Sequence, residues 1–186
     1  MKTAIKKVVA RPIKIINNIV LGMYLHLVKG KAKNIKALDV KQKKILILSP
    51  HQDDEILGCG CLIKKALEEK GLVKCIFMTD GSQSFSQELT PEAMAELRKI
   101  EAMELAKNMG MEEPVFLDCP DGLLEHDDIE AAREIAHIIE DYKPDMIFLP
   151  YFLDGHKDHT AVSGIFITAV KLLKNHKSFE TYCYEV

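Results

Sequence analysis

From Lys43 to the C-terminus, short apolar runs alternate with helical patterns, and this alternation constrains the fold more than any other feature. The runs are almost continuously apolar, which is typical of strands buried on both faces of a parallel sheet. They read KILILSP, VKCIFMTD, PVFLD, DMIFLP and FETYCYEV. The sequence therefore predicts an α/β protein whose mostly parallel sheet has helices on both faces.

Four helical segments separate the predicted strands. Glycines follow the first two segments at Gly71 and Gly110, where a helix is expected to end. Thr90 is a good N-cap for the second segment, which has a proline in its first turn. The segments are Ile56–Lys70, 91–109, the stretch DDIEAAREIAHIIEDY, and about His159 to Lys174.

Polar clusters occupy the loops that follow the predicted strands. The loops read SPHQDDE, TDGSQS, DCPDG and PYFLDGHKDH, and the polar residues that stand out in the domain lie in them. In open α/β sheets, ligands bind outside the carboxyl ends of the strands. We therefore expect a functional site at this edge of the sheet.

Histidines and carboxylates in two of these loops have the composition of a metal site. His51 and Asp54 are three residues apart where a strand turns into a helix, and GHKDH supplies histidines after the fourth strand. The two loops can be neighbours in a doubly wound sheet, so His159 can complete the set. Two histidines and a carboxylate are the protein ligands of many catalytic zinc sites. Asp53 would then be free to accept a proton.

Each motif also has a purely structural explanation. Asp158 is a good N-cap for the helix that follows it, and the run DDE is typical of a solvated helix start, where acids favour the helix dipole. Cys59 and Cys61 invite a thiolate interpretation, but small-residue packing explains them better. The five cysteines are odd in number and have no disulfide-framework spacing, which favours a reducing, cytoplasmic location.

The N-terminal region differs strongly from the rest in charge. Up to Lys44 there are twelve basic residues and one acidic residue, a net charge of +11, whereas the remainder carries 13 basic and 27 acidic residues, a net charge of −14. We interpret residues 1–42 as a basic amphipathic arm and linker, and residues 43–186 as the folded domain. Residues 12–36 suit a helix at an anionic membrane surface, or one that packs on the domain or on a second subunit. Tyr24 is the arm's one aromatic residue, so no nucleic-acid partner is expected.

Taken together, SPHQDDEILGCG and GHKDH resemble the LmbE-like, or PIG-L, N-acetylglucosaminyl deacetylases. The resemblance extends from Lys43 to Val186, and TDGSQS, the PDG at 120–122 and the helix with Arg98 and Glu101 also match. It implies a Rossmann-like three-layer sandwich and a zinc-dependent enzyme, with iron as the alternative metal in the cell.

The resemblance also assigns a role to each site residue. It places the metal on His51, Asp54 and His159, and the general base on Asp53. His156 is implied to stabilise the oxyanion, Asp158 to orient a histidine, and Arg98 and Asp121 to contact the sugar. The sequence departs from the family pattern at Gln52, where proline is usual, and it stops at YCYEV, where relatives often continue. Either the domain is a compact family member, short at its C-terminal side, or the polypeptide is part of a longer protein.

The expected reaction is hydrolysis of the acetyl amide of an N-acetylglucosaminyl conjugate. The basic arm favours a lipid-linked sugar and a peripheral position at the inner membrane face. Three alternatives stay open: hydrolysis of another amide or ester, hydrolysis of a phosphoester, and a non-catalytic, membrane-associated family member. Phosphoester hydrolysis lacks support because the sequence has no glycine-rich phosphate-binding loop. The sequence makes no prediction of oligomeric state.

Overall fold

The computed structural model describes residues 19, 23, 37–84, 88–174, 176 and 178–186. The chain divides into two units, Met1–Asp39 and Val40–Val186, and the second contains the sheet and its helices. The predicted amphipathic helix over residues 12–36 lies outside the described residues, apart from two isolated positions. Among the residues described, no helix has the length and apolar character needed to cross a membrane.

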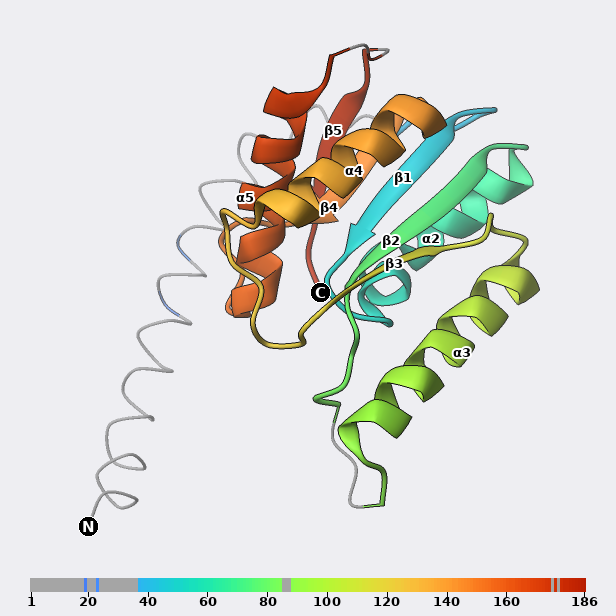
Figure 1. The fold of residues 1–186 in the computed structure, drawn as a ribbon. Coiled ribbons are helices and arrows are strands. Elements are labelled where there is room, and N and C mark those ends of the chain that lie inside the picture. The colour runs from blue at the N-terminus through green and yellow to red at the C-terminus, as the bar shows by residue number, and fades with distance from the viewer. Residues whose placement is uncertain (1–18, 20–22, 24–36, 85–87, 175, 177) are drawn as a thin grey trace. The chain divides into compact units, whose positions relative to one another are not determined.

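The described part of the second unit forms a five-stranded sheet in the order β3-β2-β1-β4-β5 (Figure 1). Every strand pair is parallel, so the prediction of a mostly parallel sheet is confirmed and exceeded. The strands are β1 (Lys44–Ser49), β2 (Leu72–Thr79), β3 (Val115–Cys119), β4 (Met146–Pro150) and β5 (Glu180–Tyr184).

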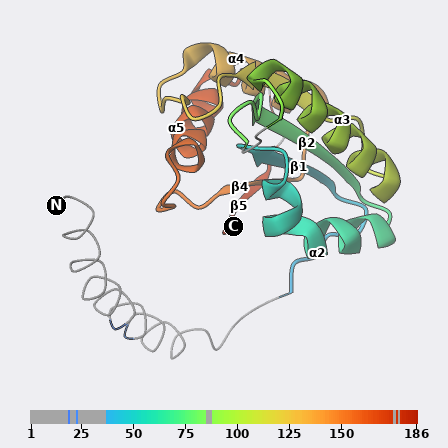
Figure 2. The ribbon, with the colours of Figure 1, turned by 90° about the horizontal axis from the view of Figure 1, so that it is seen from below.

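Helices connect successive strands and cover both faces of the sheet, as predicted. They are α2 (Asp54–Glu68), α3 (Pro91–Met109), α4 (Ile129–Tyr142) and α5 (Lys157–Leu172). Helix α2 lies on one face, and α4 and α5 lie together on the other (Figure 2). Helix α3 runs beside the β3 edge, where Lys99 contacts Asp118 and lies over the Phe116 ring.

The core follows from the alternation of side chains along the buried strands. Leu46 and Leu48 of β1 point to the α4–α5 face and join a fully apolar cluster there. Ile45 and Ile47 are equally buried and belong to the opposite face, where α2 packs. Burial of each such side chain contributes about 1.5–3 kcal/mol, which explains why β1 is apolar throughout.

Two helix starts differ from the predicted ones. Helix α2 begins at Asp54, two residues before Ile56, because the loop after β1 turns into the helix at once. Helix α5 begins at Lys157, and its N-cap is His156, whose Nδ1 accepts a hydrogen bond from the backbone N–H of Asp158. The interpretation of Asp158 as an N-cap is therefore wrong, because its side chain points into the protein instead.

Candidate metal and catalytic site

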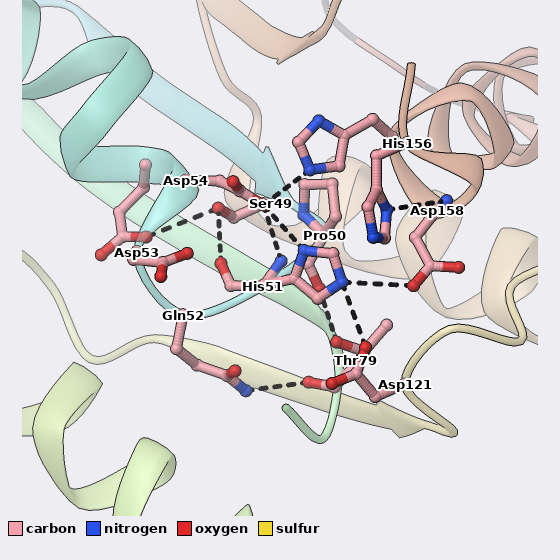
Figure 3. A network of polar contacts seen from close by, with 12 residues as sticks. Ser49, Pro50, His51, Gln52, Asp53, Asp54, Thr79, Asp121, His156 and Asp158 are labelled. Carbon is pink, nitrogen blue, oxygen red and sulfur yellow. Dashed lines mark hydrogen bonds and ion pairs between the residues drawn. The ribbon is translucent and has the colours of Figure 1, made fainter. Parts of the chain in front are cut away.

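The loops after β1 and β4 are neighbours because these two strands pair directly. This pairing brings the His51 loop beside the start of α5, more than 100 residues later in the chain (Figure 3). The loops after β2 and β3 close the other side of the site. All the site residues predicted from the sequence therefore lie at the carboxyl edge of the sheet or on the adjacent α3.

The Asp54 carboxylate stands between two histidines. Its Oδ2 lies 3.2 Å from His51 Nδ1 and 3.3 Å from His159 Nε2. Ligand atoms around a tetrahedral Zn²⁺ with bonds of about 2.0–2.1 Å are about 3.3 Å apart, so both of these separations suit the metal. His51, His156 and His159 form a second grouping, with potential ligand atoms all within 4.8 Å of one another.

Burial and charge act in opposite directions on these three residues. Burial disfavours charge on His51, but the hydrogen bond to Asp54 and the charges of Asp54 and Asp121 outweigh it and raise the His51 pKa to about 9. Burial also disfavours the charged form of Asp54, yet hydrogen bonds to His159 and His51 hold its pKa well below the usual range. The pKa of His159 is raised against the effect of burial, again chiefly by Asp54. A cation bound here would take the place of these protons.

The second nitrogen of His51 faces two further carboxylates. Its Nε2 lies 3.2 Å from Asp158 Oδ2 and 3.2 Å from Asp121 Oδ1 (Figure 3). Asp158 is fully buried and also accepts hydrogen bonds from the backbone N–H groups of Gly122 and Leu124. This arrangement favours the His51 tautomer that carries its proton on Nε2, which leaves Nδ1 available to a metal.

A break in the β2–β3 ladder brings Asp121 to His51. The register shifts between Phe77 and Thr79, and Asp118 adopts a left-handed backbone conformation with φ 54°. Lys99 Nζ binds the Asp118 carboxylate at 2.8 Å, which supports this conformation. The bulge redirects the chain before the loop that carries Asp121. Asp121 was expected to contact the sugar, and the structure places its carboxylate against His51.

His156 lies at the mouth of the site. Its ring centroid is 4.9 Å from that of His51 and 5.0 Å from that of His159, and the residue is exposed. It lines a pocket of about 350 Å³ with His51, Asp53, Arg98 and Asp121. An exposed imidazole above the two other rings can reach a substrate atom, so its predicted role at the oxyanion stays a prediction.

Asp53, which the sequence predicts to be free to accept a proton, forms an ion pair through one of its oxygens. Arg98 Nη2 lies 2.7 Å from Asp53 Oδ2, and Arg98 Nη1 lies 3.2 Å from Glu101 Oε2. Arg98 therefore reaches across the site from α3 and holds the proposed base. The Asp53 side chain is 46% exposed toward the same pocket, so it remains accessible to a substrate and to water.

The interpretation of DDE as a solvated helix start is wrong for two of its three acids. Asp54 is 4% exposed and Glu55 is 2% exposed. Burial raises the pKa of Glu55 to about 7. A solvated helix start would not bury two acids, and Asp54 is paired with two histidines.

Sequence reasoning missed two residues that support the site. Asp154 Oδ2 lies 3.1 Å from His159 Nδ1, on the ring edge opposite Asp54, and Asp154 Oδ1 accepts the backbone N–H of His156. Gln83 donates its backbone N–H to Asp121 Oδ2. A carboxylate five residues before the proposed ligand His159 was the available signal for Asp154, because metal-ligating histidines usually donate to one.

Comparison with known proteins gives consistent results. A family model described as GlcNAc-PI de-N-acetylase (PIG-L) matches residues 46–170. The diacetylchitobiose deacetylase of Thermococcus kodakarensis is 31% identical over 134 residues, which cover 69% of this chain and 49% of that protein. A probable N-acetyl-α-D-glucosaminyl L-malate deacetylase 2 of Bacillus subtilis is 29% identical, over 78% of this chain and 68% of the relative.

Among solved structures, the N,N′-diacetylchitobiose deacetylase of Pyrococcus horikoshii has the same fold, with a TM-score of 0.70 and 23% identity. The similarity covers 82% of this chain and 71% of that one. This chain thus spans from about half to about two thirds of the length of the two curated relatives described above.

Proposed function

The chain belongs to the PIG-L family of GlcNAc-PI de-N-acetylases, and on this premise we propose that it hydrolyses the acetyl amide of an N-acetylated amino sugar with a bound Zn²⁺. The observation that carries the proposal is the position of Asp54 Oδ2 between His51 Nδ1 and His159 Nε2, next to the exposed carboxylate of Asp53. Relatives named as deacetylases of diacetylchitobiose and of an N-acetylglucosaminyl malate support the substrate class.

His51, Asp54 and His159 would hold the metal. When bound, Zn²⁺ supplies a Lewis acid that polarises the acetyl carbonyl and lowers the pKa of a coordinated water. Asp158 accepts a hydrogen bond from His51 Nε2 and the Asp121 carboxylate lies 3.2 Å from the same nitrogen, so both favour the proton on Nε2. Asp154 performs the equivalent task at His159 Nδ1.

Asp53 would move the protons. Arg98 engages Asp53 Oδ2, so we assign proton acceptance from the attacking water to Oδ1. The same oxygen then gives the proton to the amide nitrogen as the carbon–nitrogen bond breaks, which releases acetate and the free amine. Amines leave poorly unless they are protonated, so this return step is as important as the first.

His156 would stabilise the oxyanion that develops on the acetyl oxygen. Its ring stands at the mouth of the pocket above the His51 and His159 rings, and it can donate a hydrogen bond toward a carbonyl bound between them. A donor aimed at the position of developing charge acts mainly in the transition state. The pocket is lined by carboxylate, guanidinium and amide groups, which suit the hydroxyls of a sugar.

The finer proposal concerns location and the group attached to the sugar. The +11 charge of the first 44 residues favours attraction to anionic lipid, at about 1 kcal/mol for each basic residue near the surface. We place the protein in the cytoplasm, peripheral to the inner membrane face, with a lipid-linked amino sugar as substrate. Liposome flotation of the whole chain and of a chain starting at Lys41 tests this. If both bind anionic vesicles equally, the arm does not contribute to membrane binding and this part of the proposal fails.

Acetate release tests the proposed reaction. Zinc-loaded protein and chelator-treated protein are given N-acetylglucosamine glycosides, an inositol or malate conjugate, and a lipid-linked sugar. We expect acetate only with metal and fastest with one class of conjugate. Failure to release acetate from any of these by protein with confirmed metal content contradicts the proposal.

A further inference from the structure

Gln52 lies between the proposed ligand His51 and the proposed base Asp53, and its carboxamide is buried. The residue is 5% exposed, and its Nε2 donates to the backbone carbonyl of Thr79 at 2.8 Å (Figure 3). Thr79 in turn donates from both its backbone N–H and its hydroxyl to the carbonyl of Pro50. The residues on both sides of His51 are therefore tied to the end of β2.

The acceptor end of this carboxamide has no partner in the described part of the chain. Gln52 Oε1 is fully shielded from solvent and makes no hydrogen bond. It points at Gly81, which has φ +68°, and a Cβ on that glycine would lie 2.3 Å from Oε1. Glycine at this position thus leaves the space that the Gln52 side chain occupies.

A buried donor without a partner belongs to Arg98, whose side chain starts beside the same glycine. Arg98 Nε is shielded from solvent and has no hydrogen-bond partner among the described residues. The Arg98 Cβ would be 3.4 Å from the same Cβ of Gly81. An orphaned acceptor and an orphaned donor therefore belong to two side chains that both border Gly81, and buried polar atoms in folded proteins are seldom left unpaired.

We propose that Gln52 is a positioning residue whose Oε1 is linked to the Nε–H of Arg98 through one bound water. Glu101 and Asp53 already hold the two terminal nitrogens of the guanidinium. A third anchor at Nε fixes the plane of the group, so that Nη2 stays on Asp53 Oδ2 and leaves Oδ1 open. A proline side chain at position 52 offers neither a donor nor an acceptor, so this device depends on the glutamine. Its consequence for catalysis rests on the proposed function.

Arginine Nε–H exchange tests the contact without any need for activity. The sequence has only three arginines, so ¹⁵N spectra give three Nε–H signals, and Arg98→Lys identifies the relevant one. In the wild type we expect the Arg98 proton to exchange with water at least tenfold more slowly than that of the exposed Arg133. Gln52→Met, which keeps the side-chain length, should remove that difference and leave Arg133 unchanged.

Two outcomes overturn the contact. If the Arg98 Nε proton of the wild type exchanges as fast as that of Arg133, the contact is refuted without any variant. The contact is also refuted if the Arg98 Nε proton still exchanges slowly in Gln52→Met. If Gln52→Met does not fold, Gly81→Ala replaces it, because its Cβ displaces Oε1 while the glutamine is retained.

Kinetics test the positioning role. Gln52→Met should lower kcat for acetate release about tenfold at unchanged metal content. Val73→Ala, a buried change at the opposite end of β2, should lower the unfolding temperature and leave kcat unaltered. An unchanged kcat in Gln52→Met, despite fast Arg98 exchange, refutes positioning. If the wild type releases no acetate, the proposed function fails, and the exchange measurement still decides the Gln52–Arg98 contact.

Discussion

Arg98 Nη2 lies 2.7 Å from Asp53 Oδ2, which joins α3 to the loop after β1 across 45 residues of sequence. The pairing occupies one oxygen of the acid that the motif marks as a base. It orients the carboxylate and leaves its other oxygen toward the pocket. The carboxylate that we propose as the general base is thus positioned by a helix at the sheet edge as well as by the loop that contains it.

Removal of His159 should abolish metal binding. His159→Ala deletes one of the three proposed metal ligands, and a site with two remaining ligands holds Zn²⁺ far more weakly. His137→Ala is the matched control, because His137 is exposed on α4 and pairs only with Asp141 among the described residues. Elemental analysis after dialysis should give about one zinc per chain in the control and far less in His159→Ala. Equal zinc content in both variants removes His159 from the ligand set.

Asp121→Asn separates two roles for this residue. If the carboxylate orients His51, as its 3.2 Å contact indicates, the change should weaken metal affinity by about 10–100-fold. If it contacts the sugar instead, the Michaelis constant should rise while metal affinity stays the same. Competition with a chelating dye measures the first quantity and steady-state kinetics the second. We expect the loss of metal affinity.

Two glycines of α2 should respond in opposite ways to alanine. A Cβ on Gly58 would lie 2.2 Å from the ring of Tyr184, whose hydroxyl is fixed to the Leu48 carbonyl. Gly58→Ala should therefore cost about 1–3 kcal/mol through overpacking. A Cβ on Gly60 meets only the flexible end of Ile56 at 3.3 Å, so Gly60→Ala should gain about 0.5–1 kcal/mol from helix propensity. Thermal unfolding of both variants checks this, and a Gly58→Ala protein as stable as the wild type refutes the close α2–β5 packing.

Glu55 should make the metal-free protein less stable as pH rises. Burial raises its pKa from the ordinary 4.5 to about 7, so the folded state binds the proton more tightly than the unfolded state. The resulting stability is complete below about pH 4.5 and is lost as pH rises through 7, a total of about 3 kcal/mol. Glu55→Gln removes this dependence. Its advantage in unfolding temperature over the wild type should be small at pH 5 and large at pH 8, and an equal advantage at both pH values contradicts the account.

The sequence predicted most of the fold because the strands are buried on both faces. Runs such as KILILSP are almost continuously apolar, which is typical of such strands. Thr90 and Gly110 mark the two ends of α3, because few other residues suit the N-cap and the left-handed C-cap conformation there. The start of α5 was harder, since both His156 and Asp158 are polar residues that can cap a helix. Asp158 does not cap α5 because its side chain accepts hydrogen bonds from the backbone N–H groups of Gly122 and Leu124 instead. The positions of those groups cannot be read from the sequence.

The sequence predicted which residues lie at the candidate site, but not which of them contact one another. His51, Asp54 and His159 could be grouped because strand order brings two loops together. The pairing of Asp53 with Arg98 depends on where α3 lies at the sheet edge, and the contact of Asp121 with His51 depends on a bulge at Asp118. Both are tertiary effects without a local signal.

The most direct test of the central claim is acetate release by Asp53→Asn compared with the wild type, both with measured zinc content. The account predicts full metal occupancy in the variant and a loss of at least about 100-fold in kcat, because a carboxamide keeps the shape of the side chain but cannot accept the proton. An Asp53→Asn protein that binds zinc and releases acetate at the wild-type rate would contradict it.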